Sequence, residues 1–148
     1  MEYKFWGWEN AHAKPINDEY KGISSPYDLY DALSTIWCKK SCAPRMRDKW
    51  SEDNKTLGQC SITSFLVQDI FGGEVYGINL PSGDIHCYNV TQSVSFDLTS
   101  EQFKGQELSY ENNPLQHRED STHFAKEEKR LRYEYLKAEL KKYCNKED

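Results

Sequence analysis

The stretch Leu57-Gly58-Gln59-Cys60-Ser61-Ile62-Thr63 decides the fold of this chain. Gly58 lets the backbone turn sharply, and the apolar residues that follow have the spacing of one helical face. These residues are Ile62, Phe65, Leu66 and Ile70. Because Gly72-Gly73 then ends the pattern, we expect a helix that begins near Cys60 and ends before these glycines.

Cys60 would lie in the first turn of this helix. The unpaired backbone N–H groups and the positive end of the helix dipole favour a thiolate there, so such a cysteine can attack a carbonyl carbon near neutral pH. Free cysteine is also among the most frequently buried residue types, and on its own Cys60 fits an inert core residue equally well.

Three strands are predicted after the helix. Residues 74–80 and 85–90 alternate around a Pro81-Ser82-Gly83 turn, and residues 93–98 form a third run. A helix followed by a small antiparallel sheet predicts an α+β fold. His86 and Asp97 fall on the second and third of these strands.

The pairing of the last two strands sets the distance between His86 and Asp97. With Val90 opposite Ser93, His86 lies directly opposite Asp97, with Cβ atoms about 4.5–5.5 Å apart. The aspartate would then accept the Nδ1–H of the imidazole. Thr91-Gln92 lacks the glycine or asparagine of a two-residue turn, so we expect a four-residue loop of the same parity.

Gln59 precedes the candidate nucleophile. Its amide is a candidate donor to an oxyanion, together with the backbone N–H of Cys60. Capping or supporting the turn is the alternative role, and the sequence favours it slightly.

Several blocks in fixed order make the region of about residues 50–103 resemble the YunG family of small bacterial proteins. They are Thr56-Leu57-Gly58-Gln59-Cys60-Ser61-Ile62-Thr63, Leu66-Val67-Gln68-Asp69, Gly72-Gly73-Glu74, His86 with Tyr88-Asn89, Asp97-Leu98-Thr99 and Gln102-Phe103. The resemblance implies the helix-then-sheet arrangement of papain-like peptidases, transglutaminase-like enzymes and bacterial cell-wall peptidases. Cys60, His86 and Asp97 fall on the equivalent positions, whereas Cys87 stands where the family pattern has an aromatic residue. We interpret Cys87 as a buried core residue, with a resolving thiol as the alternative.

Composition limits the remaining classes. The 148 residues suit a single domain, which we place at 1–148 with its core at about 25–103. A formal charge of −5 argues against nucleic-acid binding, and no apolar run is long enough for a membrane segment or a signal peptide. We therefore expect a cytoplasmic protein, in which the five cysteines, an odd number, are free thiols. Cys38 and Cys42 are too few for a structural zinc site, and we interpret them as a helix end and its loop.

Flanking segments complete the prediction. Ser25-Pro26 starts a helix, residues 39–57 form a charged loop, and Thr99 with Gln102 fits a capping box for a short helix. Residues 105–122 read as a long loop, either a lid or disordered. A helix over about 123–143 has an apolar side made of Tyr133, Leu136, Leu140 and Tyr143. This stripe is too short for a coiled coil, so we expect a monomer or a weak dimer.

The sequence favours a thiol-dependent hydrolase or acyl transferase with a Cys60-His86-Asp97 triad. It acts on an amide or related acyl group of a peptide or small-molecule substrate, without a cofactor or a metal. Two alternatives stay open. One is a non-catalytic binding or structural module that uses the three residues as an internal hydrogen-bond set. The other is a metal site made of the same Cys, His and Asp side chains.

Overall fold

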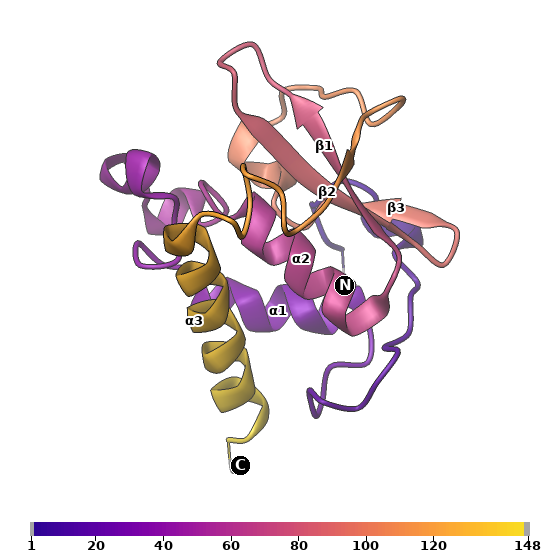
Figure 1. Ribbon diagram of the computed structural model, residues 1–148. Helices are drawn as coiled ribbons and strands as arrows, with labels where there is room; N and C mark the ends of the chain where they lie inside the picture. Colours follow the sequence, from indigo (N-terminus) through magenta and orange to yellow (C-terminus); the bar gives the residue numbers. More distant parts are fainter. Residues whose placement is uncertain (1, 147–148) are drawn as a thin grey trace.

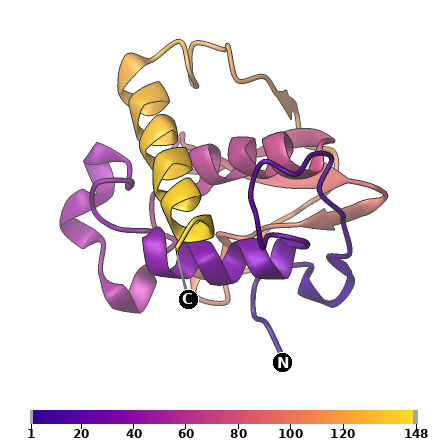
Figure 2. The same ribbon diagram turned by 90° about the horizontal axis from the view of Figure 1, so that it is seen from below.

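The computed structural model describes residues 2–146 as a mixed α+β fold (Figure 1). Its helices are α1 (Pro26–Ile36), α2 (Cys60–Phe71) and α3 (Glu127–Cys144). The antiparallel sheet contains β1 (Glu74–Asn79), β2 (Ile85–Thr91), β3 (Val94–Phe96) and β4 (Leu115–Gln116), in the order β3-β2-β1-β4. Helix α2 lies against β1 and β2, and α3 crosses both α1 and α2 (Figure 2).

Local sequence explains where α1 and α2 begin and end. Ser25 caps α1 by accepting a hydrogen bond from the Asp28 N–H, and Pro26 occupies the first turn, as predicted. Gly58 adopts φ +73°, and a Cβ atom at this position would lie 2.5 Å from the Cys42 sulfur. No other residue type fits here without displacing that sulfur, so Gly58 fixes how the chain enters α2.

The hairpin between β2 and β3 differs from the prediction. Val90 pairs with Ser95 rather than Ser93, and Gln92-Ser93 forms a two-residue turn instead of a four-residue loop. Both turn residues have positive φ, 51° and 69°. The Gln92 side chain stabilises this turn by bonding to the Lys14 N–H, the Lys14 carbonyl and the Phe71 carbonyl. A two-residue turn with positive φ usually contains glycine or asparagine, and here these contacts stabilise the turn without either residue.

The segment 105–122 is irregular for most of its length, as predicted, but it contains one short strand. Its residues Leu115–Gln116 add β4 to the free edge of β1, with Val75 opposite Gln116. Helix α3 starts at Glu127, four residues later than the predicted residue 123. On its apolar side Tyr133, Leu136 and Leu140 are buried as expected, whereas Tyr143 is 38% exposed.

The short helix after β3 is present as a 3-10 turn over Ser100–Phe103, but the capping box is not. The Thr99 hydroxyl donates to Asp97 instead of capping, and the Gln102 amide donates to the Thr99 carbonyl. The charged region 39–57 contains two further 3-10 turns, Pro44–Lys49 and Glu52–Asn54, with Trp50 buried between them.

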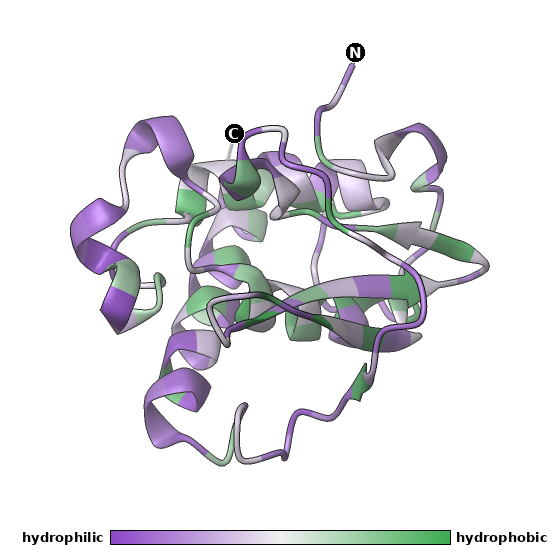
Figure 3. Cartoon of the chain, turned by 90° about the horizontal axis from the view of Figure 1, so that it is seen from above, coloured by the Kyte–Doolittle hydropathy of each residue, from purple (hydrophilic) through white to green (hydrophobic). Residues whose placement is uncertain are grey.

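Buried apolar residues form one core that also draws on segments outside residues 25–103. Phe5, Ala11 and Leu140 belong to it together with Phe65, Leu66 and Phe96. Apolar residues concentrate in the strands and in the helix that packs on them, while loops and turns are hydrophilic (Figure 3). Among the described residues, no helix has both the length and the apolar character needed to cross a membrane.

Candidate active site

Cys60 is the first residue of α2, as the sequence predicted. Gln59 occupies the N-cap position, but no side chain caps the helix, so the N–H groups of its first turn keep their donor capacity next to the Cys60 thiol. A developing negative charge on an oxygen near Cys60 would be stabilised by these N–H groups and by the helix dipole.

His86 and Asp97 are both 1% exposed and bond directly to each other. The His86 Nε2 lies 2.5 Å from the Asp97 Oδ2. Two details of the prediction were wrong. The aspartate binds Nε2 and not Nδ1. It also lies just past the end of β3 and not opposite His86, because the β3 register is shifted by two residues and the strand ends at Phe96, opposite Asn89. The shift preserves parity, so both side chains remain on the same face of the sheet.

The sulfur of Cys60 lies at an edge of the sheet. β3 pairs with β2 only at Asn89, Val90 and Thr91, which leaves the backbone edge of Ile85 and Cys87 without a strand partner in the described chain. The Cys60 Sγ lies 3.8 Å from the Ile85 carbonyl oxygen. From this edge the thiol faces the pocket that His86 also lines, and Cys87 follows two residues after Ile85 on the same strand.

These neighbours change the protonation of the site. Interaction with the Cys87 thiol, followed by that with His86, holds the pKa of the Cys60 thiol well below its usual range despite burial. Burial alone would lower the pKa of His86, but the Asp97 carboxylate and Cys60 raise it to about 10. The Nδ1 of His86 is buried and forms no hydrogen bond. The site therefore favours a thiolate–imidazolium pair at neutral pH, with Nδ1 as the nitrogen available to the reacting groups.

Asp97 receives further hydrogen bonds that hold its carboxylate in place. The Thr99 N–H and hydroxyl donate to Oδ1 at 3.1 and 3.3 Å, and the Tyr110 hydroxyl donates to Oδ2 at 2.8 Å. The Asp97 N–H donates to the Trp6 carbonyl, and the Trp6 indole stacks on the Tyr110 ring with centroids 3.7 Å apart.

Sequence reasoning missed Tyr110 and Trp6 as parts of the site. It placed Tyr110 in the loop 105–122 and gave Trp6 no role in the site. Both reach Asp97 from segments far away in the chain, and no spacing or motif in the sequence connects them. Burial, followed by the Asp97 carboxylate, raises the pKa of the Tyr110 hydroxyl, so it remains a donor.

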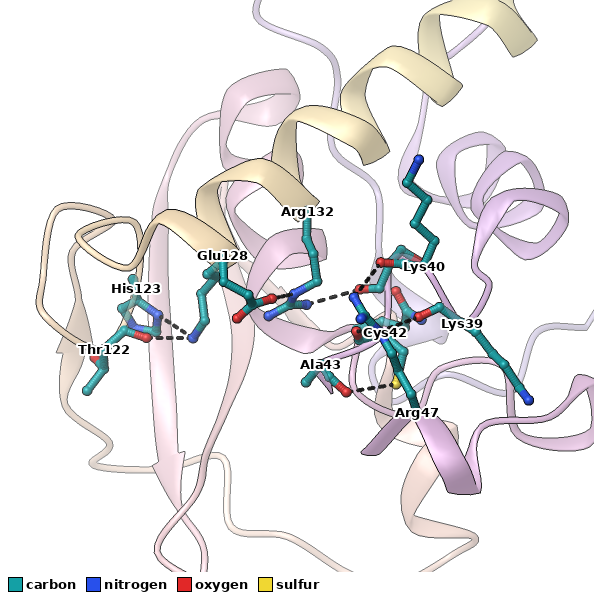
Figure 4. Close-up of polar contacts among 12 residues, drawn as sticks. Lys39, Lys40, Cys42, Ala43, Arg47, Thr122, His123, Glu128 and Arg132 are labelled. Carbon is teal, nitrogen blue, oxygen red and sulfur yellow. Dashed lines mark hydrogen bonds and ion pairs between the residues drawn. The ribbon is translucent and has the colours of Figure 1, made fainter. Parts of the chain in front are cut away.

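A small pocket of about 50 Å³ opens onto Cys60 and His86. Phe103 closes one side, with its ring edge-on to the His86 ring at 4.6 Å. The other side carries cationic side chains, namely Arg45, Lys129 and Arg132. Arg45 pairs with Asp84 at 3.1 Å. Arg132 pairs with Glu128 on the same helix (Figure 4), and it also donates to the Ser41 carbonyl.

Lys129 differs from these arginines because its partners are neutral. Its ammonium group donates to the Thr122 carbonyl at 2.5 Å and lies 3.5 Å from the His123 Nδ1. His123 is buried and bonds to Gln116 through Nε2. Burial and Lys129 lower the pKa of His123 to about 4, which keeps it neutral beside the lysine.

The Gln59 side chain is fully buried, and its amide Nε2 donates to the Cys38 carbonyl at 3.1 Å. It does not line the pocket at Cys60. Its contacts are those of a residue that supports the turn, and the oxyanion role of its amide stays a prediction that this geometry does not favour.

The remaining thiols lie apart from this pocket. Cys42 is buried, and burial raises the pKa of its thiol. Cys38 is half-buried 3.6 Å from the Tyr135 hydroxyl. Within residues 2–146 no group of three or more His, Cys, Asp or Glu side chains is arranged to hold a metal ion.

Fold and site together define a small α+β protein with a thiol at a helix start and a buried His–Asp pair beside it. The profile of the YunG protein family matches residues 25–145, so the chain belongs to the YunG family. The uncharacterized protein YunG of Bacillus subtilis (strain 168) is 31% identical over 107 residues, which cover 72% of this chain and 88% of that protein. No solved structure matches the chain.

Proposed function

We propose that the protein is a thiol-dependent hydrolase or acyl transferase with a papain-like arrangement of Cys60, His86 and Asp97. The observation that carries the proposal is the position of the Cys60 sulfur. It lies at the uncapped start of α2 and shares a pocket with His86, whose far nitrogen binds a buried aspartate. The order of the elements, a cysteine helix followed by an antiparallel sheet with the histidine and then the aspartate, supports the papain-like arrangement.

In this mechanism the Cys60 thiolate attacks the carbonyl carbon of an amide or thioester. The electron pair of the carbonyl moves to oxygen, where the N–H groups at the start of α2 stabilise the charge. The imidazolium of His86 gives its Nδ1 proton to the leaving amine or thiol as the bond to carbon breaks, which leaves an acyl-thioester on Cys60. Asp97 accepts the Nε2–H throughout and keeps the ring in position.

The second half of the reaction releases the acyl group from Cys60. Water, or an acceptor amine, loses a proton to the neutral Nδ1 of His86 and attacks the thioester carbonyl. The thiolate then leaves and the imidazolium is restored. The pocket of about 50 Å³ holds little more than the reacting group and one water, so a larger substrate needs the rim to open. Rim residues from the 3-10 turn Pro44–Lys49, such as Arg45 and Met46, are the ones that would have to move.

Acylation of Cys60 by a panel of acyl and electrophilic probes tests the proposal, with adducts located by peptide mass spectrometry. Wild-type protein is expected to form a thioester that hydroxylamine removes. Cys60→Ala and His86→Ala abolish this adduct, and Asp97→Asn reduces it while the protein stays folded. Cys144→Ser serves as the matched control, since Cys144 lies near the end of α3.

The same variants separate the alternatives. If the three residues are only structural, His86→Ala leaves the labelling kinetics of Cys60 unchanged and lowers stability by about 1–3 kcal/mol, because a buried polar partner is lost. A metal site predicts stoichiometric zinc in the purified protein and alkylation of Cys60 only after chelation. Either result would overturn the proposed function.

A further inference from the structure

Cys87 lies on β2 two residues after Ile85, whose carbonyl contacts the Cys60 sulfur, and the proposed acyl transfer does not use it. Asn89 of β2 donates to the Ser64 carbonyl of α2 at 2.9 Å, which fixes how strand and helix align. One helical turn before Ser64 is Cys60, about 6 Å back, and two strand residues before Asn89 is Cys87, about 6.6 Å back. Helix and strand run in the same direction here, so this alignment places the two cysteines side by side.

The contacts of the Cys60 sulfur agree with this alignment. It lies 3.8 Å from the Ile85 carbonyl, two residues from Cys87 on the same edge. The proximity of Cys87 lowers the pKa of the Cys60 thiol. Cys87 itself is fully buried. Interaction with Cys60, together with burial, raises the pKa of the Cys87 thiol well above its usual range. One sulfur of the pair is therefore the thiolate, and the other stays a thiol that donates to it.

The pocket selects what can reach this pair. Its volume of about 50 Å³ suits a molecule of one or two heavy atoms, and it opens onto Cys60 but not onto Cys87. Arg45 and Arg132, which line the pocket, are paired with Asp84 and Glu128. Lys129, whose partners are neutral, supplies the positive charge that stabilises a hydroxide or alkoxide leaving from an attacked oxygen. A small peroxide fits both the size and the charge of the pocket.

We propose that Cys60 and Cys87 are a peroxide-reactive thiol pair that closes into an intramolecular disulfide. The Cys60 thiolate attacks the near oxygen of the peroxide, the O–O bond breaks, and the leaving oxygen takes a proton and departs as water or an alcohol. Cys60 is thereby oxidised to the sulfenic acid. The Cys87 sulfur then attacks the Cys60 sulfur, the S–O bond breaks, and a second water departs with the Cys87 proton. The peroxide supplies the oxidising equivalents, and a dithiol reductant reverses the disulfide.

This chemistry goes beyond acyl transfer and does not depend on it. It needs only the Cys60 thiolate and the neighbouring thiol, so a protein that lacks acyl-transfer activity would still form the disulfide. In a protein that has both activities, the disulfide removes the nucleophile and protects Cys60 from irreversible oxidation to the sulfinic and sulfonic acids.

Hydrogen peroxide added to the reduced, full-length protein tests the proposal, with products read by intact mass and by mapping of unreduced peptides. Wild type is expected to lose about 2 Da through a Cys60–Cys87 disulfide that dithiothreitol restores. Cys87→Ala is expected to gain about 32–48 Da on Cys60, since the sulfenic acid is no longer trapped. Cys42→Ala is the matched control, because it removes another buried thiol and should leave the disulfide yield unchanged.

Three results would overturn the inference. In the first, Cys60 of the wild type is over-oxidised as fast as Cys60 of the Cys87→Ala variant. In the second, the disulfide joins other cysteines. In the third, peroxide leaves Cys60 unmodified. Cys87→Val, which retains the apolar volume, replaces Cys87→Ala if melting shows that the smaller side chain unfolds the protein. Acyl-probe labelling of the reduced wild type, measured in parallel, reports on the proposed function separately.

Discussion

The two faces of the sheet are built in different ways. The face toward α2 carries Val75, Cys87 and Phe96, all fully buried, together with Asn89, whose amide donates to the helix. The opposite face carries His86 and Asp97, covered by aromatic rings of Tyr88, Tyr110 and Trp6. Packing of the first face holds the fold together, whereas the second face orients a buried histidine. The two faces should therefore respond differently to substitution, one in stability and the other in the reactivity of Cys60.

The largest effect is expected on the helix side, in Ile70→Ala. Ile70 is 1% exposed near the end of α2, far along the helix from Cys60, and its truncation should lower the free energy of unfolding by about 2–5 kcal/mol. Urea denaturation measures the change, with the exposed Ile16→Ala as the control expected within about 0.5 kcal/mol of wild type. If the Ile70→Ala protein is folded but has lost Cys60 reactivity, the two faces of the sheet do not separate stability from reactivity.

His86→Ala should have the next largest effect, on reactivity. In wild type, Cys60 has a lowered thiol pKa and His86 a pKa raised to about 10, so alkylation by iodoacetamide should change little between about pH 6 and 9. In His86→Ala the thiolate loses its cation, and the rate at pH 6 should fall about 10–100-fold and rise with pH as for a free thiol of pKa about 8.5.

The control for that experiment is His117→Ala, which removes an exposed histidine. Its pH profile should overlay that of the wild type. A wild-type rate that climbs tenfold per pH unit from pH 6 to 8 would show that Cys60 is an ordinary thiol.

Tyr110→Phe should have a smaller effect, because Asp97 keeps its bonds to His86 and Thr99. Loss of the hydroxyl at 2.8 Å from Oδ2 is expected to cost about 1 kcal/mol of stability and to slow alkylation at pH 6 only a few-fold. Tyr76→Phe is the matched control, since Tyr76 stacks on Tyr88 in the same cluster and is not a donor to Asp97. Equal rates for the two variants would exclude Tyr110 from positioning the carboxylate.

Ser93→Gly should have the smallest effect, and of opposite sign. Ser93 has φ +69°, which strains a residue with a Cβ, so glycine should stabilise the protein by about 0.5 kcal/mol. Thermal melting measures the gain. Alkylation of Cys60 should not change, and a change in rate would mean that this turn affects the position of Asp97.

The sequence predicted best what depends on contiguous residues. The helical period after Cys60, the glycines at 72 and 73 and the strand alternation all act over a few positions, and the helix start and the first two strands were confirmed. The shared face of His86 and Asp97 followed from parity alone. The register of β3, by contrast, depends on Gln92 contacts to Lys14 and Phe71, which lie elsewhere in the chain. β4 and the roles of Tyr110 and Trp6 also arise from distant packing, for which the sequence has no local signal.

The Trp6–Asp97 contact also has a consequence for folding kinetics. The N–H of Asp97 donates to the Trp6 carbonyl across 90 intervening positions, and the Tyr110 ring that stacks on Trp6 bonds to the same aspartate. Closing so long a loop is slow compared with forming α2 or the β1–β2 hairpin. The helix that carries the thiol should thus form before the carboxylate that orients His86 is in place. During refolding, the circular dichroism signal of the helices should recover before the enhanced reactivity of Cys60.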